Sequence, residues 1–249
     1  MYEKHETMFE PTDNKAIWKY MSFSKFTNML SGSMYFNRID SFEDVFEGHW
    51  PKINIKCAEY LKEKMNKDIC AFDEVLRKMT YVSCFHKSNY ETAFMWKQYS
   101  NDDGLAIKTS LQRLKDAFNI TEIPIYISDV HYIDYATEYI EDISNMFSLA
   151  IHKRKSFEFE QEIRCVCIMN YADDKGNILE QYRSEEEFNR IDLNKMPKGI
   201  KVPIDLSILL EKIYISPYAP EYLEENIRML IDKFGINAEV VRSDLYKIQ

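Results

Sequence analysis

Two carboxylates stand two residues apart in the segment KSFEFEQEIRCVC, residues 155–167. Read as a strand, this segment places Glu158, Glu160, Glu162 and Arg164 on one face, because strand side chains alternate between faces. Like charges at this spacing raise the pKa of one carboxylate, which suits acid–base catalysis or the stabilisation of a cationic intermediate. The alternative is a ladder of ion pairs with Arg164, and the spacing leaves both interpretations open.

The same segment predicts an interior strand. Apolar residues occupy both faces after Glu162, a pattern typical of strands in the middle of a sheet. Carboxylates at the start of such a strand are costly unless they are paired or open to a cleft. We therefore expect Glu160 and Glu162 to line a cleft that faces the loop at 38–47.

That loop belongs to a second candidate cluster, YFNRIDSFEDVFEG at 35–48, in which charged residues stand among aromatic ones just after a predicted strand. Loops at strand ends often carry function. Arg38 could clamp an anion, while Asp44 and Glu47 could bind the hydroxyl groups of a ligand. The alternative is a charged loop that its phenylalanines attach to the core.

A third cluster lies in SCFHKSNYETAFMWKQYS at 83–100. Trp96 and Tyr99 are three residues apart and hence neighbours on a helix. They could stack on a nucleobase or a nicotinamide, or belong to the core, which we favour for Trp96. We expect His86 to be structural, because a nucleophilic pair with Cys84 would lack an acidic partner.

Composition limits the class of protein. No apolar run approaches the roughly 20 residues that cross a membrane, and the polar start argues against a secretory signal. Five cysteines without a CxxC pair favour reduced thiols in a cytoplasm and no metal site. The net charge of −9 gives no general attraction to nucleic acid. The one compact basic run, HKRK at 152–155, is interpreted as a solvated helix end.

Helical and strand patterns are mixed without strict alternation, which predicts an α+β fold with a mixed or antiparallel central sheet flanked by helices. We expect a single domain over 1–249, ending in a strand–helix–strand extension at 198–249. The periodicities predict helices at 55–79, 91–99, 136–155 and 220–235, a helix followed by a strand at 20–37, and strands at 80–85, 104–110, 124–133, 155–168, 198–206, 211–217 and 236–243.

Three blocks of sequence, KYMSFSKFTNMLSGSMYFNRIDSFEDVFEG, VSCFHKSNYETAFMWKQYSNDDGLAI and KSFEFEQEIRCV, resemble the bacterial domain-of-unknown-function family 2971 over residues 19–168. The chain departs from the family pattern at three places. Glu43 stands where asparagine is common, His86 replaces the usual serine, and phenylalanines stand near an expected tryptophan. The family implies no activity.

The order Arg38, Ser83, Glu160-x-Glu162 also resembles ADP-ribosyltransferase domains, with Tyr20 where some members carry histidine. This resemblance implies that NAD is the substrate. Glu162 would stabilise the oxocarbenium character of the ribose, and Glu160 would orient or deprotonate an acceptor that the sequence does not identify.

The remaining residues receive binding roles from the same resemblance. Arg38 would hold the pyrophosphate, Ser83 would hold the ribose or position Glu162, and Tyr99 or Trp96 would stack on nicotinamide. The biological role implied is a toxin or a defence effector in a bacterial cytoplasm.

Two other classes of function stay open. Asp44, Glu47, Glu160 and Glu162 could gather Mg²⁺ in a nuclease or phosphodiesterase, although Arg164 stands where such a site needs lysine. In a non-catalytic binding module, the same acids would form a structural network with Arg164. The sequence assigns no oligomeric state.

Overall fold

The structure is a computed structural model that describes residues 1–13, 15–65, 73–169 and 193–248. The strands are β1 (Ile17–Ser22), β2 (Ser33–Arg38), β3 (Thr80–Lys87), β4 (Gly104–Thr109), β5 (Tyr126–Asp129), β6 (His131–Ile133), β7 (His152–Arg154), β8 (Glu162–Ile168), β9 (Gly199–Pro203), β10 (Lys212–Ile215) and β11 (Glu239–Arg242). The α-helices are α1 (Phe23–Met29), α2 (Lys52–Met65), α3 (Asp73–Met79), α4 (Ala93–Tyr99), α5 (Leu111–Ala117), α6 (Ser148–Ile151), α8 (Leu206–Leu209) and α9 (Glu221–Lys233). Short 3-10 turns include η1 (Ile39–Ser41) and η4 (Lys155–Glu160).

One large sheet organises the described residues. Its order is β11-β10-β4-β1-β3-β2-β9, and β8 joins it by pairing with β3 on one side and β5 on the other. All neighbours are antiparallel except β10 and β11. The predicted α+β class with a mostly antiparallel sheet is confirmed, and so is the interior position of β8.

The register assigns each side chain of β8 to a face. Glu162 lies opposite His86, and Arg164 lies opposite Cys84. Cys165 lies opposite Ser83 and therefore points to the other face of the sheet. The two glutamates of interest and Ser83 are thus separated by the sheet itself.

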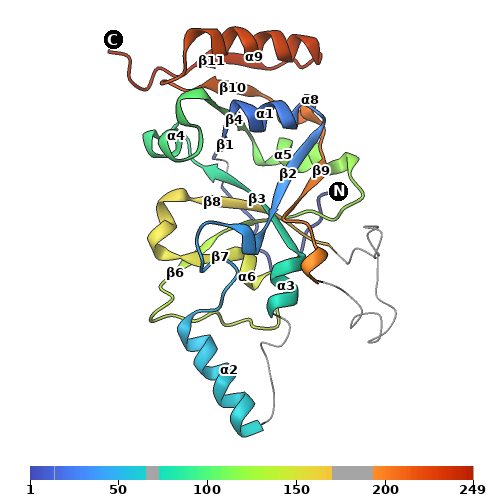
Figure 1. Ribbon diagram of the computed structural model, residues 1–249, viewed down its shortest axis with the longest axis vertical. Coiled ribbons are helices and arrows are strands. Elements are labelled where there is room, and N and C mark those ends of the chain that lie inside the picture. The colour runs from blue at the N-terminus through green and yellow to red at the C-terminus, as the bar shows by residue number, and fades with distance from the viewer. Residues whose placement is uncertain (14, 66–72, 170–192, 249) are drawn as a thin grey trace.

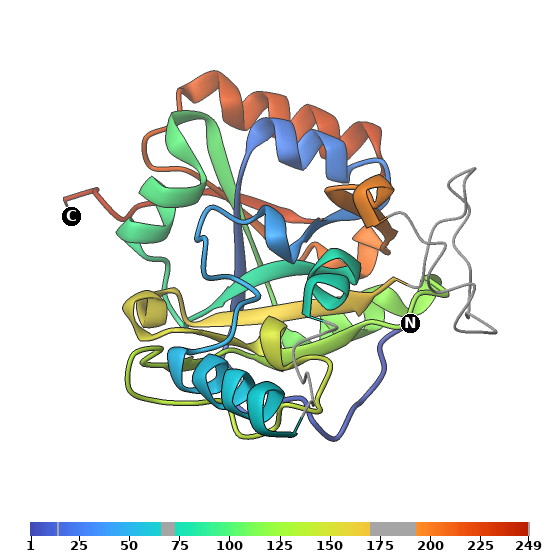
Figure 2. The same ribbon diagram turned by 60° about the horizontal axis from the view of Figure 1, so that its bottom comes forward.

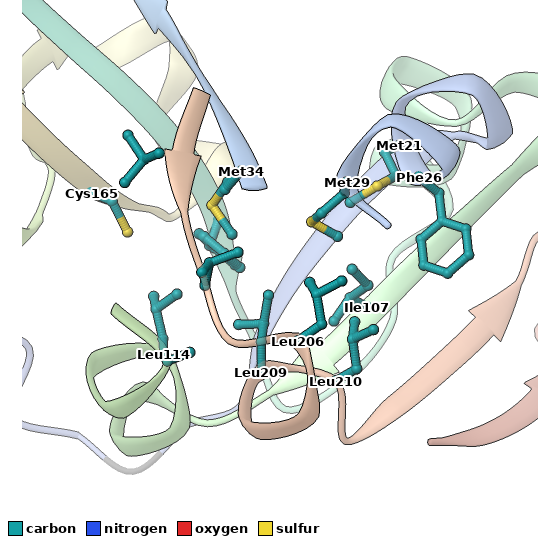
Figure 3. Packing of buried hydrophobic residues seen from close by; sticks show 14 of the residues in the cluster. Met21, Phe26, Met29, Met34, Ile107, Leu114, Cys165, Leu206, Leu209 and Leu210 are labelled. Atoms are coloured by element: carbon teal, nitrogen blue, oxygen red, sulfur yellow. The ribbon is translucent and has the colours of Figure 1, made fainter. Parts of the chain in front are cut away.

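The face that carries Cys165 is covered by the main hydrophobic core. Helices α1 and α9 cover this face in both views (Figures 1 and 2), and α5 and α8 complete the layer. Figure 3 shows residues from several of these elements converging on the sheet: Met21, Phe26, Met29, Met34, Ile107, Leu114, Cys165, Leu206, Leu209 and Leu210. The candidate site therefore occupies the opposite face, under α4, η4 and the loop after β2.

Strands β1 and β3 separate in the middle of the sheet. They pair only at Ile17 with Lys87 and Trp18 with His86. Beyond these pairs β1 continues along β4, whereas β3 continues along β8 and β2. Lys19 bridges the separation, because its ammonium donates to the carbonyl of Cys84 at 2.9 Å.

Several predicted elements differ from the structure. The strand β1, before α1, was not predicted. The predicted helix at 136–155 is wrong, since only α6 is helical there. Asp134 and Asp142 accept hydrogen bonds from nearby backbone N–H groups, which competes with helix formation.

The predicted strand at 155–168 begins only at Glu162, because residues 155–160 form η4. Gln161 then adopts a left-handed conformation with φ of 42°, which breaks the alternation expected between Glu160 and Glu162. The middle of the predicted helix at 55–79, residues 66–72, lies outside the described residues, and α2 and α3 flank it.

The C-terminal segment supplies strands to both ends of the sheet order. β9 pairs with β2, whereas β10 pairs with β4 and, in parallel, with β11. The predicted helix ending at Gly235 is confirmed, and its glycine has φ of 65°, a conformation that costs glycine little. The single-domain boundary stays a prediction. None of the described helices is long and apolar enough to cross a membrane.

Candidate active site

Arg164 lies at the centre of a buried network of charges. Its side chain has no exposed surface, and its two terminal nitrogens hold both oxygens of Glu47 at 3.0 and 2.8 Å. Its Nε donates to Glu162 Oε2 at 2.6 Å, and Nη1 also reaches the carbonyl of Ala150 at 2.9 Å. A buried guanidinium with this many acceptors holds its partners in fixed positions.

Lys153 is the second cation of the network. Its Nζ lies 2.5 Å from Glu160 Oε2, 2.7 Å from Glu162 Oε1 and 3.2 Å from Glu47 Oε1. The lysine comes from β7, which pairs with β6 in a small separate sheet, visible below β8 in Figure 1. Interpreting HKRK as a solvated helix end was therefore wrong, because Lys153 is buried in a strand and neutralises carboxylates.

The two glutamates differ sharply in protonation. Burial, reinforced by the neighbouring Glu162, raises the pKa of Glu160 to about 7. Burial also acts on Glu162, but Arg164 and Lys153 hold the pKa of that carboxyl well below its usual range. One carboxyl thus changes protonation near neutrality while its neighbour stays ionised.

Tyr99 connects this pair to the surface. Its hydroxyl donates to Glu160 Oε1 at 2.8 Å, and 38% of the residue is exposed. Trp96, one turn earlier on α4, is fully buried against Tyr20, with ring centroids 4.9 Å apart. The core position that we favoured for Trp96 is confirmed, and Tyr99 remains accessible to a ligand.

Helix α4 is anchored by an acidic residue that precedes it. Glu91 Oε2 accepts a hydrogen bond from the indole of Trp96 at 2.9 Å and another from the hydroxyl of Ser243 at 2.6 Å. Tyr20 accepts a bond from the backbone of Thr92 at 3.2 Å. These contacts fix the start of the helix and hence the position of Tyr99.

His86 lies beside the glutamates on the same face of the sheet. Its Nδ1 is 2.6 Å from the carbonyl oxygen of Glu160, and its ring centroid lies 6.2 Å from that of Tyr20. Its Nε2 is buried and has no hydrogen-bond partner among the described residues. A nucleophilic pair of His86 with Cys84, which the sequence disfavoured, has no support here either, because burial raises the pKa of that thiol far above its ordinary value.

Glu47 belongs to the network, as expected of the loop after β2, whereas Asp44 pairs with Arg154. Asp44 binds Arg154 through two contacts, at 2.7 and 3.2 Å. The guanidinium of Arg154 also lies over the ring of Phe46, 4.3 Å from its centroid. Within the described residues, no group of three or more histidine, cysteine, aspartate or glutamate side chains is placed to hold a metal ion.

Arg38 and Ser83 are not brought to the glutamates. Arg38 pairs in register with Tyr81, which lies opposite Cys167 near the far end of β8, roughly 16 Å along the strand from Glu162. Its side chain binds Asp40 and the carbonyl of Met196. Ser83 faces the main core, where its hydroxyl accepts a bond from Lys19 at 2.8 Å.

A cavity of about 420 Å³ opens beside the turn that joins η4 to β8. Its lining includes Gln161, Glu162, Lys87 and Tyr132. The hydroxyl of Tyr132 accepts a hydrogen bond from the backbone N–H of Glu162 at 2.8 Å. The start of β8 thus borders a cavity on this side.

Sequence reasoning missed Lys153 and Lys19. A signal for Lys153 existed, because HKRK directly precedes the glutamate-rich segment and a cationic run beside buried acids predicts pairing. No comparable signal marked Lys19, whose surroundings depend on the separation of β1 from β3.

Comparison with known proteins adds three findings. A comparison with curated proteins gave no match. Among solved structures, the chain is similar to "Thermus sp. 2.9 DarT in complex with ADP-ribosylated ssDNA", with a TM-score of 0.37 at 10% identity, covering 95% of this chain and 98% of that one. It is also similar to "Thermus sp. 2.9 DarT in complex with carba-NAD+", with a TM-score of 0.36 at 10% identity, covering 93% and 96%. The model of the family described as "Protein of unknown function (DUF2971)" matches residues 95–165, which confirms the predicted family resemblance from α4 to β8.

Proposed function

We propose that this protein cleaves the bond between nicotinamide and ribose in NAD and transfers ADP-ribose to an acceptor nucleophile. The observation that carries the proposal is the pair of Glu160 and Glu162. Both carboxylates contact Lys153, yet one has a pKa near 7 and the other stays ionised. Two carboxyl groups whose pKa values are pushed apart by their surroundings are the arrangement that acid–base and glycosidic chemistry require.

Glu162 supplies the permanent negative charge. When the glycosidic bond breaks, its electron pair leaves with neutral nicotinamide, and positive charge develops on the ribose. A fixed carboxylate in a site with little water stabilises this charge more than water does. Arg164 holds Glu162 in place, so the Glu162 carboxylate does not have to move during the reaction.

Glu160 accepts the proton. The acceptor's O–H or N–H group attacks the ribose carbon, and its proton passes to the Glu160 carboxylate and then to solvent. A base with a pKa near 7 is ionised in a large fraction of molecules at neutral pH and still binds the proton well. The sum is NAD⁺ plus acceptor giving nicotinamide, ADP-ribosylated acceptor and a proton.

One further group suits a dinucleotide. We assign nicotinamide stacking to Tyr99, because it is exposed and bonded to Glu160. Arg38 remains the diphosphate ligand that the sequence predicted. Lys19 and Ser83 lie on the other face of the sheet from the glutamates and have no role in this proposal.

The acceptor and the biological role are finer proposals. The proposed reaction would deplete NAD or modify an essential macromolecule. Either effect fits a toxin or a defence effector in a bacterial cytoplasm. One of the similar structures contains ADP-ribosylated ssDNA. The net charge of −9 opposes general attraction to nucleic acid, so ssDNA is one acceptor to be tested beside proteins.

A second candidate function has its own support. Both oxygens of Glu162 and both oxygens of Glu47 are engaged by cations, the pattern expected of a structural network in a non-catalytic binding module. In that case the charges maintain the fold, and the protein acts through its surface. The two candidates differ in one measurable property, the release of nicotinamide.

The experiment measures nicotinamide release from NAD by the purified protein at pH 7.5, with and without ssDNA and a bacterial protein extract. The test variant is Glu160→Gln, and the matched control is Glu158→Gln, which changes an exposed glutamate two residues away. We expect Glu160→Gln to lower the rate about 100-fold or more, and Glu158→Gln to leave it unchanged. A wild-type protein that folds and releases no nicotinamide under these conditions contradicts the proposal and favours the binding module.

A further inference from the structure

We propose that His86 is a positioning residue that holds the backbone of Glu160, and thereby places the Glu160 carboxyl between Lys153 and Tyr99. This inference deepens the proposed function and rests on it for its catalytic meaning. The contact itself is a structural relationship that can be tested without NAD.

The hydrogen bond defines the state of the imidazole. A carbonyl oxygen only accepts, so Nδ1 of His86 carries the proton in its 2.6 Å contact with Glu160. Nε2 is buried and has no partner in the described part of the chain. A second proton there would be an unsatisfied charge, so the ring stays neutral, in agreement with a pKa that burial lowers.

The bonded carbonyl belongs to an unusual turn. Glu160 ends η4, and Gln161 follows with φ of 42° and ψ of 54°. Left-handed conformations are unfavourable for residues other than glycine and persist where their surroundings hold them. Glu160 lies in η4 and Glu162 in β8, so the two do not alternate along one strand. The left-handed conformation of Gln161 turns the chain between them, and both carboxylates thereby reach Lys153.

Strand β3 holds this turn from one side. The N–H of Lys87 donates to the carbonyl of Gln161 at 2.9 Å, and His86 holds the preceding carbonyl. Within the turn itself, the side-chain amide of Gln161 donates to the carbonyl of Glu158 at 2.7 Å. Adjacent residues of β3 therefore bind adjacent carbonyls of the turn, and His86 is the one that acts through its side chain.

One observation separates His86 from an ordinary core residue. It lies opposite Glu162 in the β3–β8 register, so its bond determines the spacing of the two carboxyl groups.

The experiment compares His86→Asn with His86→Leu. Asparagine keeps an N–H donor close to the position of Nδ1, whereas leucine keeps bulk and removes the donor. The pKa of Glu160 is measured by NMR titration of ¹³C-labelled carboxyl groups, assigned with Glu160→Gln. We expect a pKa near 7 in wild type and in His86→Asn, and a fall of about one pH unit or more in His86→Leu, because a released carboxyl gains solvent.

An unchanged Glu160 pKa in folded His86→Leu overturns the inference. If that variant does not fold, the tautomer of wild-type His86 is measured by ¹⁵N NMR at pH 7. A neutral ring with its proton on Nδ1 supports the inference, whereas a ring protonated on Nε2 or on both nitrogens contradicts it. Nicotinamide release distinguishes the two proposals. Release with an unmoved pKa leaves only the proposed function standing, and a shifted pKa without release leaves only the positioning role.

Discussion

Arg164 and Glu162 are joined by a 2.6 Å bond between Nε and Oε2, on the same face of β8 and without exposure of the arginine. The other oxygen of Glu162 is held by Lys153 at 2.7 Å. The carboxylate proposed to stabilise a reaction intermediate is therefore also a structural element. Loss of activity after its substitution does not by itself identify a catalytic role.

We expect Glu162→Gln to lower the free energy of unfolding by about 3–5 kcal/mol, because it leaves two buried cations with too few anions. The measurement is urea denaturation at pH 7, with Glu158→Gln as the control, which should change stability by less than about 0.5 kcal/mol. Stability equal to wild type would show that the network does not support the fold, and it would favour a purely functional role for the charge.

Glu160 gives stability a distinct pH dependence. Its pKa is raised in the folded state, so its favourable contribution is complete below the ordinary glutamate pKa and is lost as pH rises through about 7. Glu162 acts in the opposite sense, since its pKa is lowered and its contribution is lost only as pH falls through the acidic range.

Thermal melting between pH 5 and 8 measures this effect. We expect the wild-type Tm to fall relative to that of Glu160→Gln over this interval, because glutamine cannot ionise, while the buried histidines, whose pKa values are lowered, affect both proteins alike. Parallel curves for the two proteins would contradict the raised pKa of Glu160. Glu158→Gln should follow wild type, since its carboxylate is exposed.

Arg38→Met tests the diphosphate ligand that the sequence predicted. If Arg38 holds the diphosphate, millimolar NAD raises the Tm of wild type and not of Arg38→Met. Lys19→Met is the control. Its ammonium binds the neutral Ser83 hydroxyl and Cys84 carbonyl on the other face of the sheet from the glutamates, so we expect this variant to be as stable as wild type or more stable and to keep the NAD effect. An NAD effect that survives in Arg38→Met would contradict the assignment.

The sequence predicted the fold class, the interior position of β8 and the approach of Glu47 to the glutamates. These predictions rest on local patterns, since apolar residues on both faces identify a central strand wherever it lies. Sequence-based prediction failed where single residues change a local pattern. Gln161 interrupts the alternation of the strand predicted at 155–168, and Asp134 and Asp142 form turns in or beside the helix predicted at 136–155. The face of the sheet to which Ser83 points, and the position of Lys19 between β1 and β3, depend on the register of strands that are distant in sequence. Periodicity does not specify that register.

The hydrogen bonds of Glu91 join the end of β11 to the helix that carries Tyr99. A change more than 140 residues from Tyr99 can therefore reach the reaction site through a single carboxylate. Ser243→Ala keeps the strand and removes the hydroxyl, so it loosens the helix without touching any group that contacts Glu160. The C-terminal edge of the sheet therefore helps to fix the position of Tyr99, which lies on the opposite face from the main core.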